Sequence, residues 1–408
     1  MRIIHTGDWH LGKNLEGHSR LDEQEKFLDF FTEKCNELKP ELILIAGDIY
    51  DAPNPPARAE KLFYDALKKL SRGGECVSVV IAGNHDNPER IASAGSLAAE
   101  HGIIISGTSK AVVQTGAYGK HRVTASGEGF FELEINGERA VIAAVAYPSE
   151  KRLNEVFYRD KEDEKERQAS YAKKVGRLFK RLEANFKEDS INITLSHLFA
   201  SGSEPSGSER SSSLGGSFII NTELLPKHAD YTALGHIHKP QILPNTGGRV
   251  RYCGSPIHYN KTEISFNKSF YYIDINKNKA KNKPDFNIGA VQIPVFKPIC
   301  IWKAKSAAEA IEMCKQHSGE ESWVYLEIKC GSYIREDEIK QMKTLKKDII
   351  EIRPVIEAQE NKRKLEISEL SFKDKFIEFY KQQNKNTPDE ELIQMLLSIM
   401  EEEAVETD

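Results

Sequence analysis

Short apolar runs alternate with longer amphipathic segments through the first half of this chain, and this alternation limits the folds that it can adopt. The runs expected to form strands are residues 2–6, 42–46, 77–82, 191–195 and 231–234. Between the first two runs, Leu21, Phe27 and Phe31 recur at near-helical spacing, and a second helical pattern follows Pro56. Strands that alternate with helices are typical of α/β layering, which is the fold class that we expect.

Three further segments depart from this pattern. Between residues 111 and 147 the apolar period shortens toward two on both sides of Asn136-Gly137, which predicts a β-hairpin. The mixed-charge stretch 159–188 has apolar residues at helical spacing and predicts one amphipathic surface helix. Residues 201–217 are rich in Ser and Gly and predict a flexible loop or, because they closely follow His197, a mobile loop that borders a site.

Composition breaks divide the chain into three parts. The polar, basic stretch 276–285 is expected to end a first domain of residues 1–280. Residues 285–365 have a β-α-β-α-β pattern, which predicts a small α/β domain. Residues 366–408 are expected to form two helices, of which the second begins with a capping box at 387–390 and has eight acidic and no basic residues from Asp389 onward.

The overall composition is that of an ordinary soluble protein. The chain has 408 residues, of which 39% are hydrophobic and 29% charged. Its apolar runs are far shorter than the roughly 18–20 residues that cross a bilayer, and we expect a cytoplasmic protein. Six cysteines without a C-x-x-C pair predict buried, reduced thiols. The net charge of −5 argues against coating nucleic acid by bulk electrostatics, but allows a nucleic-acid enzyme whose positive charge comes from metal ions.

Five clusters of metal-type side chains each closely follow a predicted strand. They are Asp8 and His10, Asp48 and Asp51, Asn84-His85-Asp86, His197, and finally His236 and His238. The carboxyl ends of strands in an α/β sheet form the crevice where ligands bind, so we expect the five clusters to converge. Carboxylate and amide oxygens with imidazole nitrogens, and no thiolate, suit Mn²⁺, Fe²⁺ or Zn²⁺ with open water positions.

Each cluster taken alone also has a structural explanation. Asp-x-His after a strand is common by chance, and Gly-Asp-x-x-Asp could be a turn in which Asp51 caps a helix. Gly-Asn-His-Asp could form a tight turn with Asn in the left-handed region. A single histidine such as His197 is more often a satisfied core or surface residue than a ligand. The order of all five clusters at strand ends favours one shared metal site.

In this order, DxH, GDxxD, GNHD, a single His and GHxH resemble the motifs of the calcineurin-like metallophosphoesterase superfamily. HTGDWHLGK, AGDIYD, AGNHD, ALGHIHKPQ and RYCGSPI are similar to stretches of its nuclease branch, and the similarity extends over the whole chain. The resemblance implies a β-sandwich flanked by helices, a small α/β capping domain that binds DNA, and a C-terminal helical arm.

The resemblance also implies two metal ions, most often Mn²⁺, that share one carboxylate. One ion would be held by Asp8, His10, Asp48 and His238, and the other by Asp48, Asn84, His197 and His236. A bridging carboxylate offsets part of the repulsion between two dications, which lie about 3.5–4 Å apart in such sites. His85 is implied as the residue that contacts the phosphate and protonates the leaving oxygen, with Asp86 orienting its ring.

The implied function is that of a Mn²⁺-dependent DNA nuclease in DNA repair, recombination and replication. It would act on double-strand ends as an exonuclease, nominally 3′ to 5′, and on hairpins and single strands as an endonuclease. The implied partners are an SMC-like ATPase and a second copy of the nuclease subunit. The terminal helices would dock on the ATPase, or pack on their own domain. Two other functions stay open: a phosphodiesterase for small nucleotides or phosphoproteins, and a structural tether for DNA ends.

A few residues near these motifs are harder to interpret. Archaeal and eukaryotic relatives have a histidine where this chain has Asp51, and no catalytic role is assigned to Asp51. Lys13, Arg20 and Arg251 follow or precede site motifs and are candidates for contacts with DNA phosphates. For any one of them, a solvated surface position is the more common case.

Overall fold

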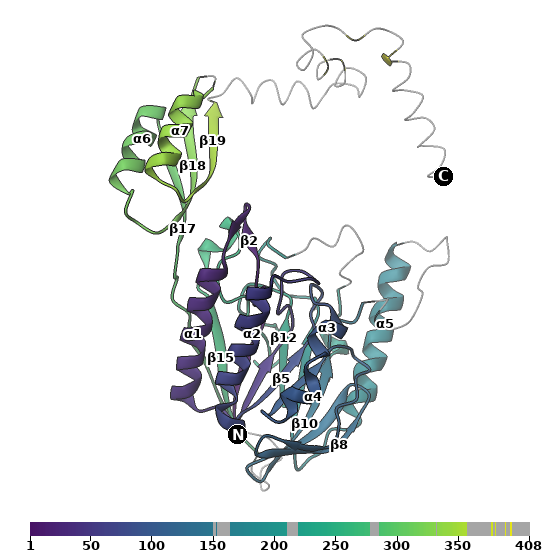
Figure 1. The fold of residues 1–408 in the computed structure, drawn as a ribbon. Helices are drawn as coiled ribbons and strands as arrows, with labels where there is room; N and C mark the ends of the chain where they lie inside the picture. The colour runs from purple at the N-terminus through teal and green to yellow at the C-terminus, as the bar shows by residue number, and fades with distance from the viewer. Residues whose placement is uncertain are drawn as a thin grey trace. The chain divides into compact units, whose positions relative to one another are not determined.

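The computed structural model describes residues 1–149, 152, 164–209, 219–277, 285–331 and 333–356, and also residues 377, 380, 388, 392 and 393 (Figure 1). Chain contacts divide it into two compact units, Met1–Cys300 and Ile301–Asp408. Each unit has a hydrophobic core of its own.

One half of the first unit is a six-stranded sheet. Its strands lie in the order β16 (Asp285–Gln292), β15 (Ser269–Asn276), β1 (Arg2–Thr6), β4 (Leu42–Ile45), β5 (Val77–Ile81) and β6 (Ile103–Ser106). The last four run parallel, and they are connected through α1 (Leu21–Leu38), α2 (Ala57–Leu70) and the short helices α3 (Pro88–Ala92) and α4 (Gly95–Ala99). The predicted strands and helices of this region are thus confirmed.

The other half is an eight-stranded sheet. Its order is β13 (Gln241–Ile242), β14 (Val250–Tyr252), β12 (Tyr231–Gly235), β11 (Ile191–His197), β10 (Glu138–Val145), β9 (Phe130–Ile135), β8 (His121–Gly127) and β7 (Gly116–Tyr118). Strands β9 and β10 form the predicted hairpin, and its turn residues Asn136 and Gly137 have φ of 51° and 82°. The predicted surface helix is α5 (Glu164–Glu183). A separate ribbon joins β2 (Asn14–Leu15) to β3 (His18–Ser19).

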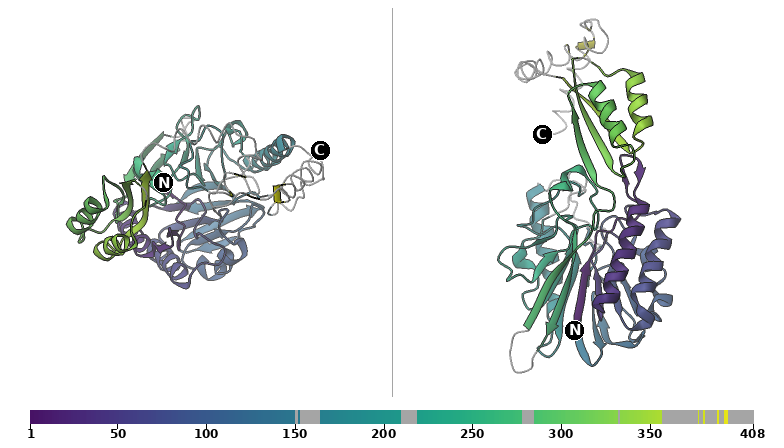
Figure 2. Two further views of the ribbon diagram at one scale, coloured as in Figure 1. Left: turned by 90° about the horizontal axis from the view of Figure 1, so that it is seen from above. Right: turned by 90° about the vertical axis from the view of Figure 1, so that its left-hand side faces the viewer.

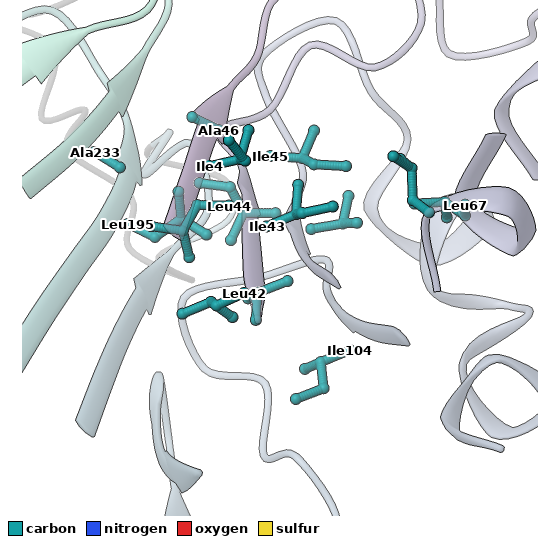
Figure 3. Close-up of a cluster of buried hydrophobic side chains, with 14 of the residues drawn as sticks. Ile4, Leu42, Ile43, Leu44, Ile45, Ala46, Leu67, Ile104, Leu195 and Ala233 are labelled. Carbon is teal, nitrogen blue, oxygen red and sulfur yellow. The ribbon is translucent and has the colours of Figure 1, made fainter. Parts of the chain in front are cut away.

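The two sheets pack face to face. Because successive side chains of a strand point to opposite faces, Ile142 and Ala144 of β10 belong to the core between the sheets, whereas Val145 packs with α5. In Figure 3, Leu44 of β4 points toward Leu195 of β11 across this core. Helices cover the outer faces of both sheets (Figure 2). This arrangement confirms the expected β-sandwich flanked by helices.

The second unit is smaller and has the predicted β-α-β-α-β order. Its elements are β17 (Ile299–Ala304), whose first two residues precede the division after Cys300, α6 (Ala307–Gln316), β18 (Trp323–Cys330), α7 (Glu336–Leu345) and β19 (Ile349–Ile356). The central strand β18 lies between β17 and β19. Its alternate residues Val324, Leu326 and Ile328 pack with residues of both helices in one core. The Ser306 side chain accepts a hydrogen bond from the Glu309 N–H and caps α6.

The end of the first unit differs from the expected domain boundary. Residues 285–292 were expected to open the second domain, but β16 pairs with β15 over its whole length and extends the first sheet. A polar, basic break looks the same between two paired strands as between two domains, which is why composition misplaced it. The helix pair expected at 366–408 lies outside the described residues, apart from single positions.

Two other expectations concern the whole chain. Within the part that the structure describes, no helix combines the length and apolar character that a membrane span requires. All six cysteines are free thiols, and Cys35, Cys76, Cys253 and Cys314 are buried. The expectation of mostly buried cysteines is therefore confirmed.

Candidate metal centre

All five clusters lie at the carboxyl ends of strands, and these strands come from both sheets. In the six-stranded sheet, Asp8 and His10 follow β1, Asp48 follows β4, and residues 84–86 follow β5. In the eight-stranded sheet, His197 ends β11, and His236 and His238 follow β12. The structure therefore brings the predicted ligands together where the ends of two sheets meet.

The backbone at these strand ends is unusual. Asp8, His10, Asp48 and His236 have φ of 51°, 44°, 47° and 103°. Non-glycine residues in such regions cost about 1–3 kcal/mol each, and they cluster at functional sites because the surroundings hold them there. The two sheets also approach closely, since a Cβ added to Gly235 would overlap the Ala46 carbonyl oxygen. Only glycine fits at that position.

A first ligand group consists of Asp8, His10 and His238, which are all at most 2% exposed. The Nε2 atoms of His10 and His238 lie 3.0 Å apart. Asp8 Oδ1 accepts a hydrogen bond from the His236 N–H (2.8 Å), while Asp8 Oδ2 is buried without a hydrogen-bond partner among the described residues. Two imidazole nitrogens and a carboxylate oxygen thus face one another in a buried environment.

A second ligand group consists of Asp48, His197 and His236, with the amide oxygen of Asn84 beside it. Asn84 Oδ1 lies 2.9 Å from His197 Nε2 and 3.0 Å from His236 Nδ1. His197 Nδ1 donates to the Ala46 carbonyl oxygen (2.8 Å), so its Nε2 lone pair is directed into the group. Asp48 Oδ2 lies 3.4 Å from His197 Nε2 and 3.5 Å from His10 Nε2, so Asp48 reaches both groups.

Burial and mutual charge shift the pKa values of these residues. Burial raises the pKa of Asp8 to about 7 and lowers the pKa of His10 and of His236 to about 3. Burial also acts to lower the pKa of His197, but the carboxylates of Asp48 and Asp8 outweigh it and raise that pKa to about 9. For Asp48, burial is outweighed by His197 and His85, which bring its pKa well below the usual value. The carboxylates of Asp48 and Asp8 thus favour positive charge at His197.

This donor set fits divalent cations. A buried polar atom without a partner costs about 1–3 kcal/mol, and Asp8 Oδ2 is such an atom among the described residues. The facing nitrogens of His10 and His238 would both be satisfied by a cation between them. Carboxylate, amide and imidazole donors are those of divalent first-row metals. Each of the two groups could therefore hold a divalent cation.

The loop after β5 departs from one expectation. His85 is 5% exposed, and its Nδ1 lies 2.7 Å from the Asp51 carbonyl oxygen, which orients the ring. The Asp86 carboxylate instead accepts three backbone hydrogen bonds, from Gly83, Ile49 and Tyr50. Asp86 was expected to orient His85, but its oxygens are directed to these N–H groups. We therefore correct its role from a catalytic residue to a clamp between two loops.

The three basic candidates lie in different environments. Arg20 is only 1% exposed, pairs with Glu23 and donates to the His258 carbonyl oxygen, so the expectation that it contacts DNA is not supported. Sequence alone did not show that its charge is neutralised in the core. Lys13 is partly exposed and pairs with Asp51 (2.8 Å). Arg251 donates to the Gly248 carbonyl oxygen (2.8 Å) and lies over the Tyr271 ring.

The structure also adds residues that sequence reasoning missed. Glu263 and Lys268 form a fully buried ion pair beside His238. From the Ser/Gly-rich segment, the Ser208 hydroxyl lies 2.6 Å from His238 Nδ1, and Glu209 accepts from the His238 N–H (2.9 Å). Isolated charged residues carry no periodic signal. The closeness of the Ser/Gly-rich segment to His197 was the only hint in the sequence, and the described part of this segment does border the site.

The fold and the site are those of a calcineurin-like phosphoesterase. The model of the calcineurin-like phosphoesterase family matches residues 1–240, and the chain belongs to this family. Over 404 residues it is 36% identical to the SbcD subunit of the nuclease SbcCD from Bacillus subtilis (strain 168), and the match covers 98% of this chain and 97% of that protein. Within the phosphoesterases the chain is therefore a member of the SbcD family. A second model, described as a type 5 capsule protein repressor C-terminal domain, matches residues 295–384.

Proposed function

We propose that this chain is a metal-dependent DNA nuclease that hydrolyses phosphodiester bonds together with an SbcC-type, SMC-like ATPase. The observation that carries the proposal is the pair of buried ligand groups connected by Asp48 at the ends of strands from both sheets. Similarity to an SbcCD nuclease subunit along nearly the whole chain supports the choice of DNA over small phosphate esters.

Two divalent ions, for which we propose Mn²⁺, would occupy the two groups. Asp8, His10, Asp48 and His238 would hold one ion, and Asp48, Asn84, His197 and His236 the other. When bound, the ions would polarise the scissile phosphate and lower the pKa of the attacking water. The residues themselves supply a rigid cradle, because backbone contacts fix Asp8, Asp48 and His197.

His85 is proposed to protonate the leaving oxygen. Its Nδ1 is held by the Asp51 carbonyl oxygen, so Nε2 is the ring atom that would carry the proton to the substrate. The ring packs edge-on against His10, with 4.7 Å between the ring centroids, so the acid lies beside the first ligand group. Asp86 supports this geometry indirectly by tying the loop of His85 to the loop after Asp48.

Several finer features belong to the same proposal. The enzyme would act as a double-strand exonuclease, nominally 3′ to 5′, and as a hairpin and single-strand endonuclease in repair, recombination and replication. Residues 1–280 together with β16 would form the nuclease domain, the rest of 285–365 the capping domain that binds DNA, and 366–408 the helix pair that docks on the ATPase. Lys13 and Arg251 would contact DNA phosphates. A homodimer of nuclease subunits in the cytoplasm, associated with the nucleoid, completes the proposal.

The test compares substrates and metals. Purified protein, alone and with its ATPase partner, is incubated with labelled hairpin and blunt-ended DNA, cyclic nucleotides and a chromogenic phosphate ester, each in Mn²⁺ and in Mg²⁺. We expect DNA cleavage in Mn²⁺ and two bound ions by metal analysis. Turnover of cyclic nucleotides or the chromogenic ester without DNA cleavage would favour the small-substrate phosphodiesterase. DNA binding without cleavage would favour a tether.

A further inference from the structure

Glu263 and Lys268 form a buried ion pair that contacts His238. Glu263 lies in the short helix Lys261–Ser265, and Lys268 immediately precedes β15. The side chains of Glu263 and Lys268 are 0% and 2% exposed, and they pair through Glu263 Oε2. Removing two charges from water costs several kcal/mol for each ion, and an apolar pair of similar volume is often at least as stable. A pair buried at this depth therefore points to a role besides stability.

Lys268 is fully satisfied at this position. An ammonium group has three N–H donors, and here they are directed to Glu263 Oε2, Ser255 Oγ (2.7 Å) and the His238 carbonyl oxygen (3.0 Å). The lysine thus holds both the carboxylate and the backbone of His238.

Glu263 contacts the imidazole ring of His238. Its Oε1 lies 3.3 Å from His238 Nδ1, while its Oε2 also accepts from the Tyr259 N–H (3.2 Å). The pair therefore contacts His238 at two points, the ring nitrogen through Glu263 and the carbonyl oxygen through Lys268.

The contact with Glu263 determines which ring nitrogen of His238 carries the hydrogen. His238 Nε2 faces His10 Nε2 at 3.0 Å, and an ion between them requires lone pairs on both atoms. His238 must then carry its hydrogen on Nδ1. The Ser208 hydroxyl near Nδ1 can donate or accept, so it does not select this tautomer, whereas a carboxylate only accepts. Glu263 is thus the neighbour that selects the ligating form.

We propose that Glu263, held in place by Lys268, is a positioning residue that fixes His238 in the tautomer and orientation needed to bind the first metal ion. This inference rests on the proposed function only in taking His238 as a ligand. Partners of this kind on metal-bound histidines typically change metal affinity by about 10–100-fold when they are removed. Among the described residues, Glu263 contacts His238 of the first ligand group and none of the second, so the second group should keep its affinity.

The experiment measures Mn²⁺ binding to the full chain by calorimetry and electron paramagnetic resonance. Glu263→Gln keeps the size but can turn an NH₂ toward Nδ1, and it leaves Lys268 unpaired. The double variant Glu263→Gln/Lys268→Met removes that unpaired charge, so a loss of stability can be separated from a loss of tautomer control. In both variants we expect one Mn²⁺ site unchanged, the other about 10–100-fold weaker, and loss of the spin-coupled two-ion signal.

Asp230→Asn is the matched control. Asp230 also pairs with a largely buried lysine, Lys277 (3.1 Å), but it precedes β12, while His236 and His238 follow that strand. This variant should lose stability and keep both Mn²⁺ affinities. In the wild type loaded with Zn²⁺, imidazole ¹⁵N spectra should show His238 protonated at Nδ1. Unchanged affinity in a folded Glu263 variant, or protonation at Nε2, would overturn the inference, whereas a wild type without two bound ions would overturn the proposed function.

Discussion

Asn84 Oδ1 lies 2.9 Å from His197 Nε2, although the two residues are 113 positions apart and lie at the ends of strands from different sheets. Asn84 follows β5 of the six-stranded sheet, and His197 ends β11 of the eight-stranded sheet. This contact joins the two halves of the sandwich at the second ligand group. The candidate metal centre is therefore a property of the packed pair of sheets and of neither sheet alone.

Replacing the shared carboxylate should affect both ligand groups together. In Asp48→Asn, the amide oxygen can still accept the His85 N–H, but the negative charge near His10 and His197 is lost. We expect fewer than two bound Mn²⁺ ions and a fall in DNA cleavage on the order of 10³-fold, about 4 kcal/mol in the barrier. Metal analysis and cleavage rates check this, and full occupancy with normal rates would refute the shared role.

Replacing the proposed acid should separate metal binding from cleavage. His85 contacts the Asp51 carbonyl oxygen and belongs to neither proposed ligand set. His85→Gln should therefore keep two bound ions and DNA affinity while cleavage falls about 10²–10⁴-fold, the usual contribution of a general acid. A leaving group that needs no proton, such as 4-nitrophenolate, should recover most of the loss. Equal losses on both kinds of substrate would count against proton donation by His85.

The guanidinium of Arg152 should support the loop of Asn84 and His85. Arg152 donates to the Gly83 carbonyl oxygen (2.7 Å) and to the Asp86 carbonyl oxygen (2.6 Å), which flank those two residues. Lysine cannot reproduce this fork. Arg152→Lys should lower the free energy of unfolding by about 1–3 kcal/mol and reduce kcat more than it raises KM. A variant that keeps kcat while losing stability would assign Arg152 a purely structural role.

Stability without metal should fall in acid partly because of His5. This buried ring contacts the Tyr231 hydroxyl (2.9 Å) and the Leu234 carbonyl oxygen (3.2 Å), and burial lowers its pKa to about 3. Below the unfolded-state pKa of about 6.5, the unfolded chain binds a proton that the folded chain does not. Proton binding to the unfolded chain therefore lowers the free energy of unfolding as the pH falls from 6.5 toward 3. At pH 5 the loss is about 2 kcal/mol, and above pH 6.5 His5 causes no loss.

The measurement is urea unfolding in the presence of a chelator between pH 7.5 and 4.5. His5→Gln should be less stable than the wild type at pH 7.5, because the glutamine packs less well. Its stability should then depend less steeply on pH, and the difference between the two proteins should narrow in acid. Parallel curves for both proteins would show that His5 titrates alike in the folded and unfolded states.

Removing the terminal segment should separate partner binding from catalysis. We expect a chain that lacks residues 366–408 to keep Mn²⁺-dependent cleavage of single-stranded DNA, because the ligand groups lie entirely in the first unit. The same truncated chain should fail to co-purify with the ATPase. A truncated chain that still forms the complex would place the docking surface elsewhere.

Local patterns in the sequence predicted most of the secondary structure. The apolar runs around Ile43, Val79 and Ile193 form strands, and such runs can be recognised from consecutive residues. The five clusters could be located at strand ends because each closely follows such a run. Pairing between distant segments carries no local signal. The addition of β16 to the first sheet and the burial of Arg20 therefore had to come from the structure.

In the site, too, local patterns were predictable from the sequence and contacts between distant segments were not. Residues that follow strands, such as Asp8 and His236, were predictable from their position. The residues that support them, such as Glu263 behind His238, come from elements with no regular pattern. The partner of His85 was also misassigned, because a backbone carbonyl oxygen, that of Asp51, cannot be recognised from the residue type.

The close approach at Gly235 has a consequence for folding. Because no Cβ fits between Gly235 and the Ala46 carbonyl oxygen, main-chain contact sets the distance between the two sheets, and with it the spacing of Asp8 from His236. A chain whose sheets have not docked therefore has no metal centre. Divalent ions would then act as a folding ligand for the first unit, adding about 2.7 kcal/mol at a free concentration 100 times the Kd. The free energy of unfolding of the first unit should thus rise with the free concentration of the metal ion.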